Sequence, residues 1–144
     1  MGERVSDEVV VAAPIDAVWN TITDLASYPQ WADGVLETEI LTTDGDGYPA
    51  TARFRVDARV AEVAYVLQYR YDDYDIRWTL VEGETISQLD GAYDLVETDG
   101  GTHVRYRLEA DVDLPLPGFL KKRAAKQILD QGLRGLKARA ETQG

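Results

Sequence analysis

The side chains of this sequence with the most chemical potential are tyrosines. The chain has eight tyrosines and three tryptophans, but one histidine and no cysteine. Tyr65, Tyr69, Tyr93 and Tyr106 each carry a hydroxyl that can donate a hydrogen bond or act as a general acid. A tyrosine with an ordinary pKa near 10 is a poor base at neutral pH. The expected chemistry is therefore donation to, or orientation of, a bound molecule.

Several other chemistries are excluded by composition. Without cysteine the chain forms no disulfide and has no thiolate nucleophile, and a single histidine argues against a zinc site. We expect no metal and no cofactor. His103 alternates with the buried positions of its segment and shares the outer face with Arg105, so we expect it in solvent rather than in a catalytic role. No catalytic residue is assigned.

The net charge of −11 would repel a nucleic-acid backbone, so we expect no nucleic-acid partner. The basic residues gather in the last segment, where we expect a solvated helix face; a transient contact with anionic lipid or an acidic partner is the alternative. No apolar run is long enough to cross a bilayer, and no charged-then-apolar leader precedes the first strand-like segment. These features predict a soluble, cytoplasmic protein, either monomer or homodimer.

The elements that must position the tyrosines are strands. From Val35 to about Asp113 apolar and polar residues alternate between short turn sequences, which predicts antiparallel neighbours. The predicted strands are 35–43, 50–61, 63–72, 76–82, 86–98 and 102–113. The boundary near Ala61 has no glycine or proline, so one long bent strand there stays open.

Alternation also predicts which side chains share the concave face of the sheet. Large aromatic side chains dominate this set, and a dry core would more simply use leucine, isoleucine and phenylalanine. We expect the hydroxyls of Tyr48, Tyr71 and Tyr74, in contrast, to lie in water. The concave set that we expect to contact a ligand is Phe54, Val56, Tyr65, Leu67, Tyr69, Trp78, Leu80, Tyr93, Leu95, Tyr106 and Leu108.

Helices are predicted on both sides of this strand-rich region. A first strand over 4–12 precedes Pro14, which starts a helix whose apolar positions recur at spacings of three and four. Pro29 predicts that Tyr28 leaves helical geometry, with a second short helical turn near Trp31. After 114–118 a long amphipathic helix is expected over 119–140. Its apolar stripe contains Ala125, Ile128, Leu129, Gly132, Leu133, Leu136 and Ala140.

These elements predict an α+β helix-grip fold of residues 1–144 as a single domain. A curved antiparallel sheet of about seven strands would wrap around the long C-terminal helix, with two short helices after strand 1. A curved sheet and a straight helix leave space between them. We expect a ligand cavity there, completed by Trp31 and by Ile128, Leu129, Gly132, Leu133 and Leu136 of the helices. Gly91 and Gly132 serve either to enlarge this cavity or to allow close packing.

Several motifs resemble a known superfamily. The segment Ala13-Pro14-Ile15-Asp16-Ala17-Val18-Trp19 and the later Tyr28-Pro29 and Trp31 resemble the N-terminal signature of the START-like (SRPBCC) superfamily of polyketide cyclases/dehydrases and lipid-transfer proteins. The segments 78–83, 89–95 and 100–104 are similar to its later strands. Leu116-Pro117-Gly118-Phe119-Leu120 is similar to the start of the last helix in its coenzyme Q-binding and cyclase branches. The resemblance covers nearly the whole chain and implies a hydrophobic cavity under the C-terminal helix.

Three functions follow as hypotheses. The first is a carrier or sensor that binds a small hydrophobic molecule such as a lipid, a quinone or a polyketide-like compound. The second is an aromatase/cyclase-like enzyme that uses cavity tyrosines; it is weakened because no inward arginine or histidine can be placed, whereas the resemblance implies polar cavity groups in cyclases. The third is a protein-interaction module that uses the basic helix or an open sheet edge.

Overall fold

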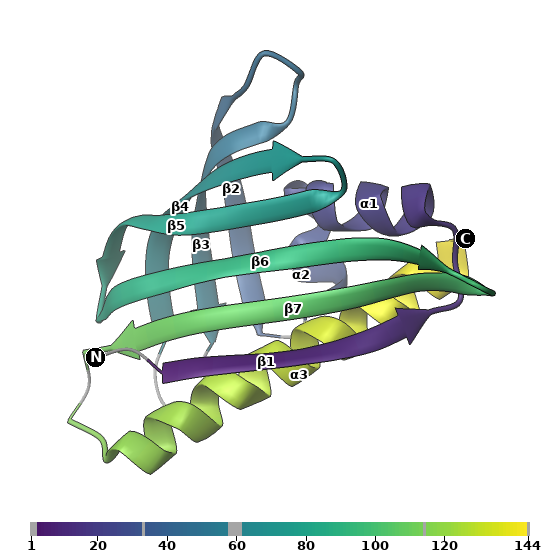
Figure 1. The fold of residues 1–144 in the computed structure, drawn as a ribbon. Coiled ribbons are helices and arrows are strands. Elements are labelled where there is room, and N and C mark those ends of the chain that lie inside the picture. The colour runs from purple at the N-terminus through teal and green to yellow at the C-terminus, as the bar shows by residue number, and fades with distance from the viewer. Residues whose placement is uncertain (1–2, 33, 58–61, 114, 144) are drawn as a thin grey trace.

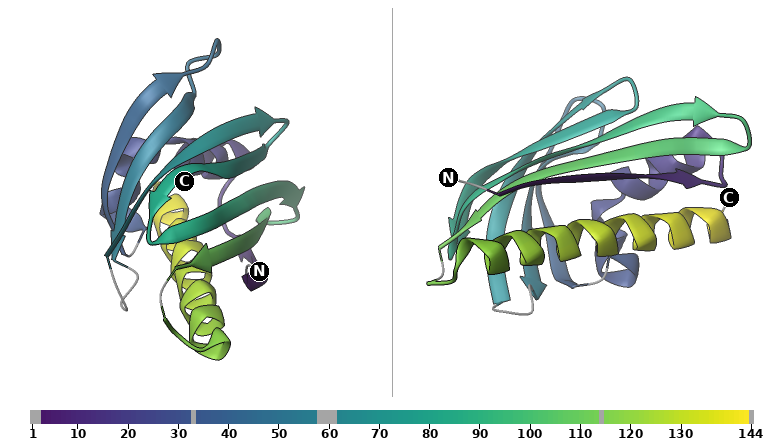
Figure 2. Two further views of the ribbon diagram at one scale, coloured as in Figure 1. Left: turned by 90° about the vertical axis from the view of Figure 1, so that its left-hand side faces the viewer. Right: turned by 60° about the horizontal axis from the view of Figure 1, so that its bottom comes forward.

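A computed structural model describes residues 3–32, 34–57, 62–113 and 115–143. The sheet curves over the last helix, and the first helices lie on the same side of the sheet as that helix (Figures 1 and 2). In chain order the elements, among them the short 3-10 helix η1, are β1 (Glu3–Val11), α1 (Ile15–Thr23), η1 (Leu25–Ser27), α2 (Tyr28–Trp31), β2 (Val35–Thr43), β3 (Pro49–Asp57), β4 (Glu62–Asp72), β5 (Asp75–Glu84), β6 (Ile86–Thr98), β7 (Gly101–Val112) and α3 (Gly118–Gln143).

The described strands form one antiparallel sheet of seven, in the order β1-β7-β6-β5-β4-β3-β2. Strands β2 to β7 follow one another as neighbours, with few residues between consecutive strands, and β1 pairs with β7 at the other side of the sheet. This is the helix-grip architecture that the sequence predicts. The edges of the sheet are β1 and β2.

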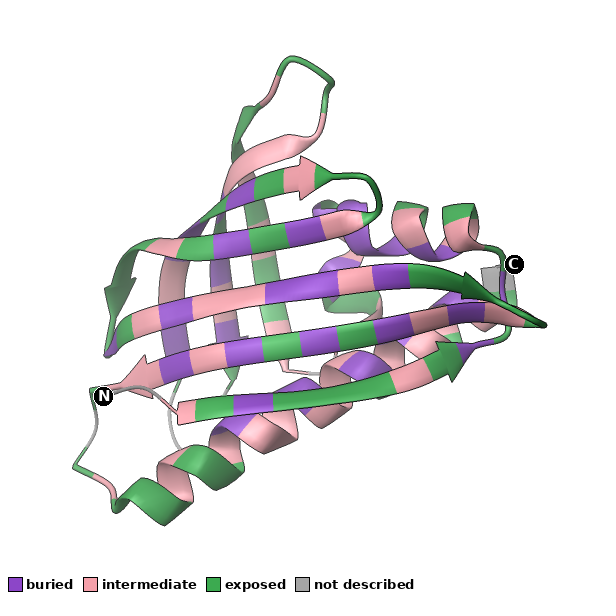
Figure 3. Cartoon of the chain, viewed as in Figure 1, coloured by how far each residue is buried: buried purple, intermediate pink, exposed green. Residues whose placement is uncertain are grey.

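Side-chain alternation produces the two faces as expected (Figure 3). In β7 the residues Val104, Tyr106 and Leu108 are buried, whereas Arg105 and Arg107 between them are exposed. Long arginine side chains on the outer face pair with carboxylates of neighbouring strands, as Arg107 does with Asp94 at 2.9 Å. The concave face is therefore apolar and the convex face charged, which fixes the register of each strand.

Helix α3 buries its apolar stripe against the concave face. Leu129, Leu136 and Ala140 have no exposed surface, and α3 lies along β1 and β7 (Figure 2). Most basic side chains of α3 lie outside this stripe, and one of them, Lys126, pairs with Asp7 of β1 at 3.1 Å. Burial of the leucines provides most of the attachment, because exposed ion pairs contribute little.

The short helices are placed by one buried tyrosine. Tyr28 donates a hydrogen bond from its hydroxyl to the carbonyl of Ile22, which links α2 to the last turn of α1. The prediction that Tyr28 leaves helical geometry was wrong, since it has φ −53° and ψ −41° and is the first residue of α2. The α-region is only disfavoured before proline, and Pro29 in the first turn of α2 needs no helical hydrogen-bond donor.

A second aromatic cluster holds α1 against two strand hairpins. The Trp19 ring meets the rings of Tyr48, Tyr71 and Tyr74 edge-on at 5.6 to 6.1 Å. These hydroxyls were expected in water, and the structure gives each of them a protein partner as well. Tyr71 donates to the Pro49 carbonyl at 2.7 Å, Tyr74 donates to Asp16 at 2.6 Å, and Tyr48 accepts from the Trp19 indole at 3.2 Å.

Strand ends differ from the predictions at turns without a strong sequence signal. The strand predicted over 76–82 is longer in the structure, where β5 continues to Glu84 and the chain turns at Thr85, whose φ is +61°. Strand β3 ends at Asp57; the last residues of the predicted strand 50–61, with the open boundary near Ala61, lie outside the described residues. Helix α3 begins at Gly118 and ends at Gln143, slightly beyond both predicted ends.

Candidate functional site

A cavity of about 130 Å³ lies between the concave face of the sheet and the first half of α3. Its wall is mostly apolar and aromatic, with contributions from α2, from six strands and from α3. The lining residues are Tyr28, Trp31, Ala32, Val35, Phe54, Val56, Asp57, Val63, Tyr65, Leu67, Tyr69, Trp78, Ile86, Leu89, Tyr93, Tyr106, Leu108, Ala110, Val112, Leu116, Lys121, Ala124, Ala125, Ile128 and Gly132.

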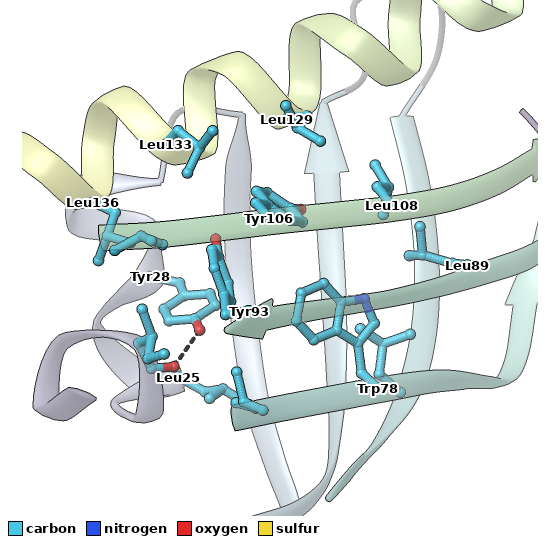
Figure 4. Packing of buried hydrophobic residues seen from close by; sticks show 14 of the residues in the cluster. Leu25, Tyr28, Trp78, Leu89, Tyr93, Tyr106, Leu108, Leu129, Leu133 and Leu136 are labelled. Carbon is cyan, nitrogen blue, oxygen red and sulfur yellow. Dashed lines mark hydrogen bonds between the residues drawn. The ribbon is translucent and has the colours of Figure 1, made fainter. Parts of the chain in front are cut away.

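Aromatic rings form a continuous band across the cavity wall. Tyr69 of β4, Trp78 of β5, Tyr93 of β6 and Tyr106 of β7 stand on adjacent strands, with ring centroids 4.5 to 5.9 Å apart along the band. Tyr93 and Tyr106 point from the sheet toward α3, and the Trp78 indole lies beside them (Figure 4). Interlocking rings of this kind form a rigid wall because each ring limits the motion of the next.

The cavity hydroxyls are neutral and available as hydrogen-bond donors. Burial raises the pKa of Tyr69 and Tyr93 well above that of a free tyrosine, and it also raises the pKa of Tyr65 and Tyr106. No described residue hydrogen-bonds to these four hydroxyls, and among the described residues the fully enclosed polar side-chain atom without a partner is Thr38 Oγ1. The hydroxyls therefore open into the cavity, where a ligand oxygen or water can meet them.

The structure brings together most of the predicted site residues from the sheet, α2 and α3. The ones that line the cavity are Trp31, Phe54, Val56, Tyr65, Leu67, Tyr69, Trp78, Tyr93, Tyr106, Leu108, Ile128 and Gly132. Side chains from elements far apart in sequence meet because the sheet curves under α3. Whether each of them contacts a ligand stays a proposal.

The remaining predicted residues do not line the cavity. Leu95, Leu129, Leu133 and Leu136 are buried in packed core, with exposures of at most 5%. The last three project from α3 toward the concave face of the sheet (Figure 4). Leu80 lies next to a register shift between β4 and β5; it is partly buried, packs against the core and is not part of the cavity wall. Alternation assigns a face but not the distance from a cavity.

Sequence reasoning missed several wall residues. Tyr28 was expected only to end a helix, yet its spacing of three from Trp31 puts both rings on one face of α2, with centroids 4.9 Å apart. Lys121 lies four residues before Ala125 of the apolar stripe, and this spacing would have identified it as inward. Asp57 alternates with Phe54 and Val56, so the strand pattern placed it on the outer face, yet at the end of β3 it lies on the cavity wall. Leu116 lies in a loop, where no periodic signal applies.

Gly91 and Gly132 have different roles. A Cβ atom at Gly91 would lie 2.3 Å from the Trp78 ring, so this glycine provides space for the indole rather than for a ligand. At Gly132 a Cβ would lie 3.1 Å from the Tyr106 ring and 3.7 Å from the Tyr93 hydroxyl. Gly132 also lines the cavity, so it allows close approach of α3 and leaves the Tyr93 hydroxyl accessible.

The single histidine of the chain does not line the cavity. His103 lies on the outer side of β7, as expected, with its Nε2 atom 3.4 Å from Glu8 of β1. No group of three metal-ligating side chains occurs in the described part of the chain. Among the helices formed by the described residues, none combines the length and the apolar character needed to cross a membrane.

Comparisons with known proteins agree with this architecture. The structure of a START superfamily protein from Mycobacterium smegmatis superposes with a TM-score of 0.91 at 26% identity, covering 99% of this chain and 100% of that one. The aromatase/cyclase Zhui from a Streptomyces species gives 0.83 at 19% identity, covering 99% and 96%. A protein from Thermus thermophilus gives 0.82 at 21% identity, covering 98% and 99%.

The curved sheet, the gripped helix and the cavity between them define a START-like helix-grip protein. The family model described as polyketide cyclase / dehydrase and lipid transport matches residues 3–141. The chain belongs to this family.

Proposed function

We propose that this protein is a carrier or sensor that binds a small hydrophobic molecule, such as a lipid, a quinone or a polyketide-like compound, in the cavity under α3. The observation that supports the proposal best is the combination of an apolar aromatic wall with tyrosine hydroxyls that have no partner among the described residues. Pockets for small molecules typically combine an apolar lining with a few polar groups that orient the ligand. Membership of a family named for cyclases and lipid transport agrees with it.

The size of the cavity limits what it can hold without rearrangement. At about 130 Å³ it is close to the engineered protein cavity of about 150 Å³ that binds benzene, and below the roughly 300 to 1,000 Å³ of pockets for drug-sized ligands. A ligand of one or two rings, or a short acyl chain, matches this volume. A longer lipid requires α3 to move away from the sheet.

Native mass spectrometry of the freshly purified protein tests the proposal directly. We expect a bound small molecule as a defined mass increment that is lost on denaturation. Once this molecule has been removed, naphthalene serves as a neutral probe of the empty protein. Binding of naphthalene should raise Tm, because a ligand that binds the native state stabilises that state. Absence of any increment, together with no effect of naphthalene on Tm, would contradict the proposal.

A matched pair of α3 variants tests whether the binding occurs in the cavity. Ala124 lines the cavity and Ala138 is exposed on the same helix. The substitution Ala124→Leu adds three carbon atoms inside the cavity and should reduce the affinity for naphthalene at least tenfold. Ala138→Leu makes the same change on the surface and should leave affinity unchanged. Equal affinities in both variants would show that naphthalene binds elsewhere.

A second candidate function is an aromatase/cyclase-like reaction. It is favoured by the open hydroxyls of Tyr65, Tyr69, Tyr93 and Tyr106, whose raised pKa values make them donors that can hold a carbonyl or an enol. Single Tyr→Phe substitutions separate the two functions once a substrate is known. Loss of turnover with retained affinity would support the enzyme, whereas changed affinity alone would support the carrier.

Other expectations remain proposals. We propose one domain over residues 1–144, which is supported by a family match that extends over residues 3–141. We also propose a cytoplasmic location and, at most, transient membrane contact through the basic face of α3. Sedimentation velocity distinguishes the monomer from the homodimer.

A further inference from the structure

One charged side chain breaks the apolar pattern of the helix face that covers the cavity. The residues of α3 on the cavity wall are Lys121, Ala124, Ala125, Ile128 and Gly132, at spacings that keep them on one side of the helix. At the position of Lys121 the pattern of the stripe would place an apolar residue. Positions where a sequence departs from the pattern of its own fold are expected at functional sites.

Lys121 lies at the open end of the cavity. Toward the middle of the sheet the wall is closed by Trp78, Tyr93 and Tyr106, which are 5 to 7% exposed. At the other end the Lys121 side chain is 24% exposed, and Asp57 on the opposite wall is exposed as well. A ligand that enters here places its inner end against the aromatic band and its outer end beside Lys121.

The ammonium group of Lys121 is held in place but keeps donor capacity for a ligand. It pairs with Asp111 of β7, with Nζ and Oδ1 3.9 Å apart. This distance is too long for a hydrogen bond. Asp111 is not part of the cavity wall. The lysine can therefore donate hydrogen bonds toward a group at the mouth.

Electrostatics on the α3 side of the mouth favour an anion. Lys121 lies in the first turn of α3, where the backbone N–H groups carry partial positive charge and where no acidic residue occurs. Lys122 and Arg123 follow directly. Asp57 opposes this field from the β3 side, so an anion at the mouth should lie closer to α3 than to β3. The neutral hydroxyls deeper in the cavity can likewise donate to ligand oxygens.

We propose that Lys121 determines specificity for ligands with a negatively charged end, of the class of small aromatic or short-chain carboxylic acids. The apolar body fills the cavity and the carboxylate remains at the mouth, where it accepts a charge-assisted hydrogen bond from Nζ of Lys121. This inference depends on the proposed binding function and deepens it by naming the ligand class. Asp111 acts as a positioning residue for the lysine.

Two probes that differ mainly in charge test this proposal. We choose 3-phenylpropanoate and 3-phenylpropan-1-ol, and measure affinity for both by isothermal titration calorimetry at pH 7. The wild-type protein should bind the acid about fivefold to tenfold more tightly than the alcohol, the range expected for a partly exposed charged hydrogen bond. In Lys121→Met this preference should disappear through weaker acid binding. The affinity for the alcohol should change by less than about twofold, because methionine keeps the apolar character of the wall.

The adjacent residue provides the control. Lys122 is exposed and does not line the cavity, so Lys122→Met removes the same charge from the same helix and should keep most of the preference. Lys121→Arg keeps the positive charge at the mouth of the cavity and should retain the preference for the acid. Circular dichroism and Tm should confirm that each variant is folded, which is expected because methionine suits a helix.

The outcomes are distinct. Equal binding of both probes by the wild type, binding of the alcohol alone, or an equal loss in the Lys121→Met and Lys122→Met variants would overturn the role of Lys121 and leave the cavity proposal intact. If neither phenylpropanoate nor phenylpropanol binds to protein that still binds naphthalene, the role of Lys121 is likewise overturned and the cavity proposal stands. Failure of both probes and of naphthalene would contradict the proposed binding function itself.

Discussion

Gly91 provides the sharpest test of how the cavity wall is built. Gly91 of β6 and Trp78 of β5 are directly paired across the sheet. A Cβ atom at Gly91 would lie 2.3 Å from Cζ2, 2.4 Å from Cε2 and 2.7 Å from Nε1 of the indole. Carbon atoms in contact normally lie about 3.5 to 4.0 Å apart, so Gly91→Ala must displace the indole by roughly 1 Å.

The cost of this displacement follows from the surroundings of Trp78. Its ring is 5.5 Å from that of Tyr93 and 5.8 Å from that of Tyr106, and the residue is 6% exposed. Overpacking at such a site typically costs about 1 to 3 kcal/mol. At about 2 to 4 °C per kcal/mol for a protein of this size, Tm should fall by roughly 2 to 12 °C. The free space available to the indole is the cavity, so affinity for naphthalene should fall too.

Urea unfolding followed by circular dichroism measures this effect. Gly45→Ala is the matched control, because nothing lies within 4 Å of a Cβ at Gly45, and its stability should change by less than about 0.5 kcal/mol. Adding Trp78→Phe to Gly91→Ala should recover part of the loss, since the smaller ring relieves the contact. A Gly91→Ala protein as stable as the wild type, with unchanged naphthalene affinity, would refute the reasoning.

Two further predictions concern buried tyrosines. Tyr28→Phe removes the donor to the Ile22 carbonyl and should lower the free energy of unfolding in urea by about 1 to 3 kcal/mol. Tyr74→Phe removes an exposed contact with Asp16 and should lower it by less than about 0.5 kcal/mol. Equal losses in the two variants would argue against the role of Tyr28. Burial raises the pKa of Tyr69 and Tyr93 well above 10, so the native state holds protons that the unfolded chain loses near pH 10. Stability should be constant below about pH 9 and fall as pH rises above 10, by up to about 1.4 kcal/mol per pH unit for each such tyrosine. Urea midpoints between about pH 8 and 11 measure this, and a flat profile would contradict it.

Much of the fold could be predicted from local patterns. Alternation of the kind seen from Val104 to Leu108 identifies strands and their buried face, because a sheet with one apolar face allows only one register. The helical period identified α3 and its stripe. Predictions were wrong where local signals are weak or conflict: Tyr28 is helical despite Pro29, and β5 continues through Gly83.

The candidate site was predicted in part. The aromatic residues Tyr69, Trp78, Tyr93 and Tyr106 follow from alternation, since they share a face on adjacent strands. Neither strand alternation nor the helical period could separate a residue on a cavity wall from one in packed core, and so Leu133 of α3 was treated like Ile128. That distinction depends on how closely α3 approaches each part of the sheet, which results from all contacts together.

Local patterns in the chain suffice for the order of elements, the inward face of each strand and the apolar stripe of α3, because these depend on the short periods of strands and helices. Where space remains depends on how the elements pack in three dimensions. The position of α3 over the curved sheet closes the core around Leu136 and leaves a hollow beside Ile128, with Lys121 at its mouth. A cavity is the difference between two surfaces that are distant in the chain, and no local pattern encodes that difference.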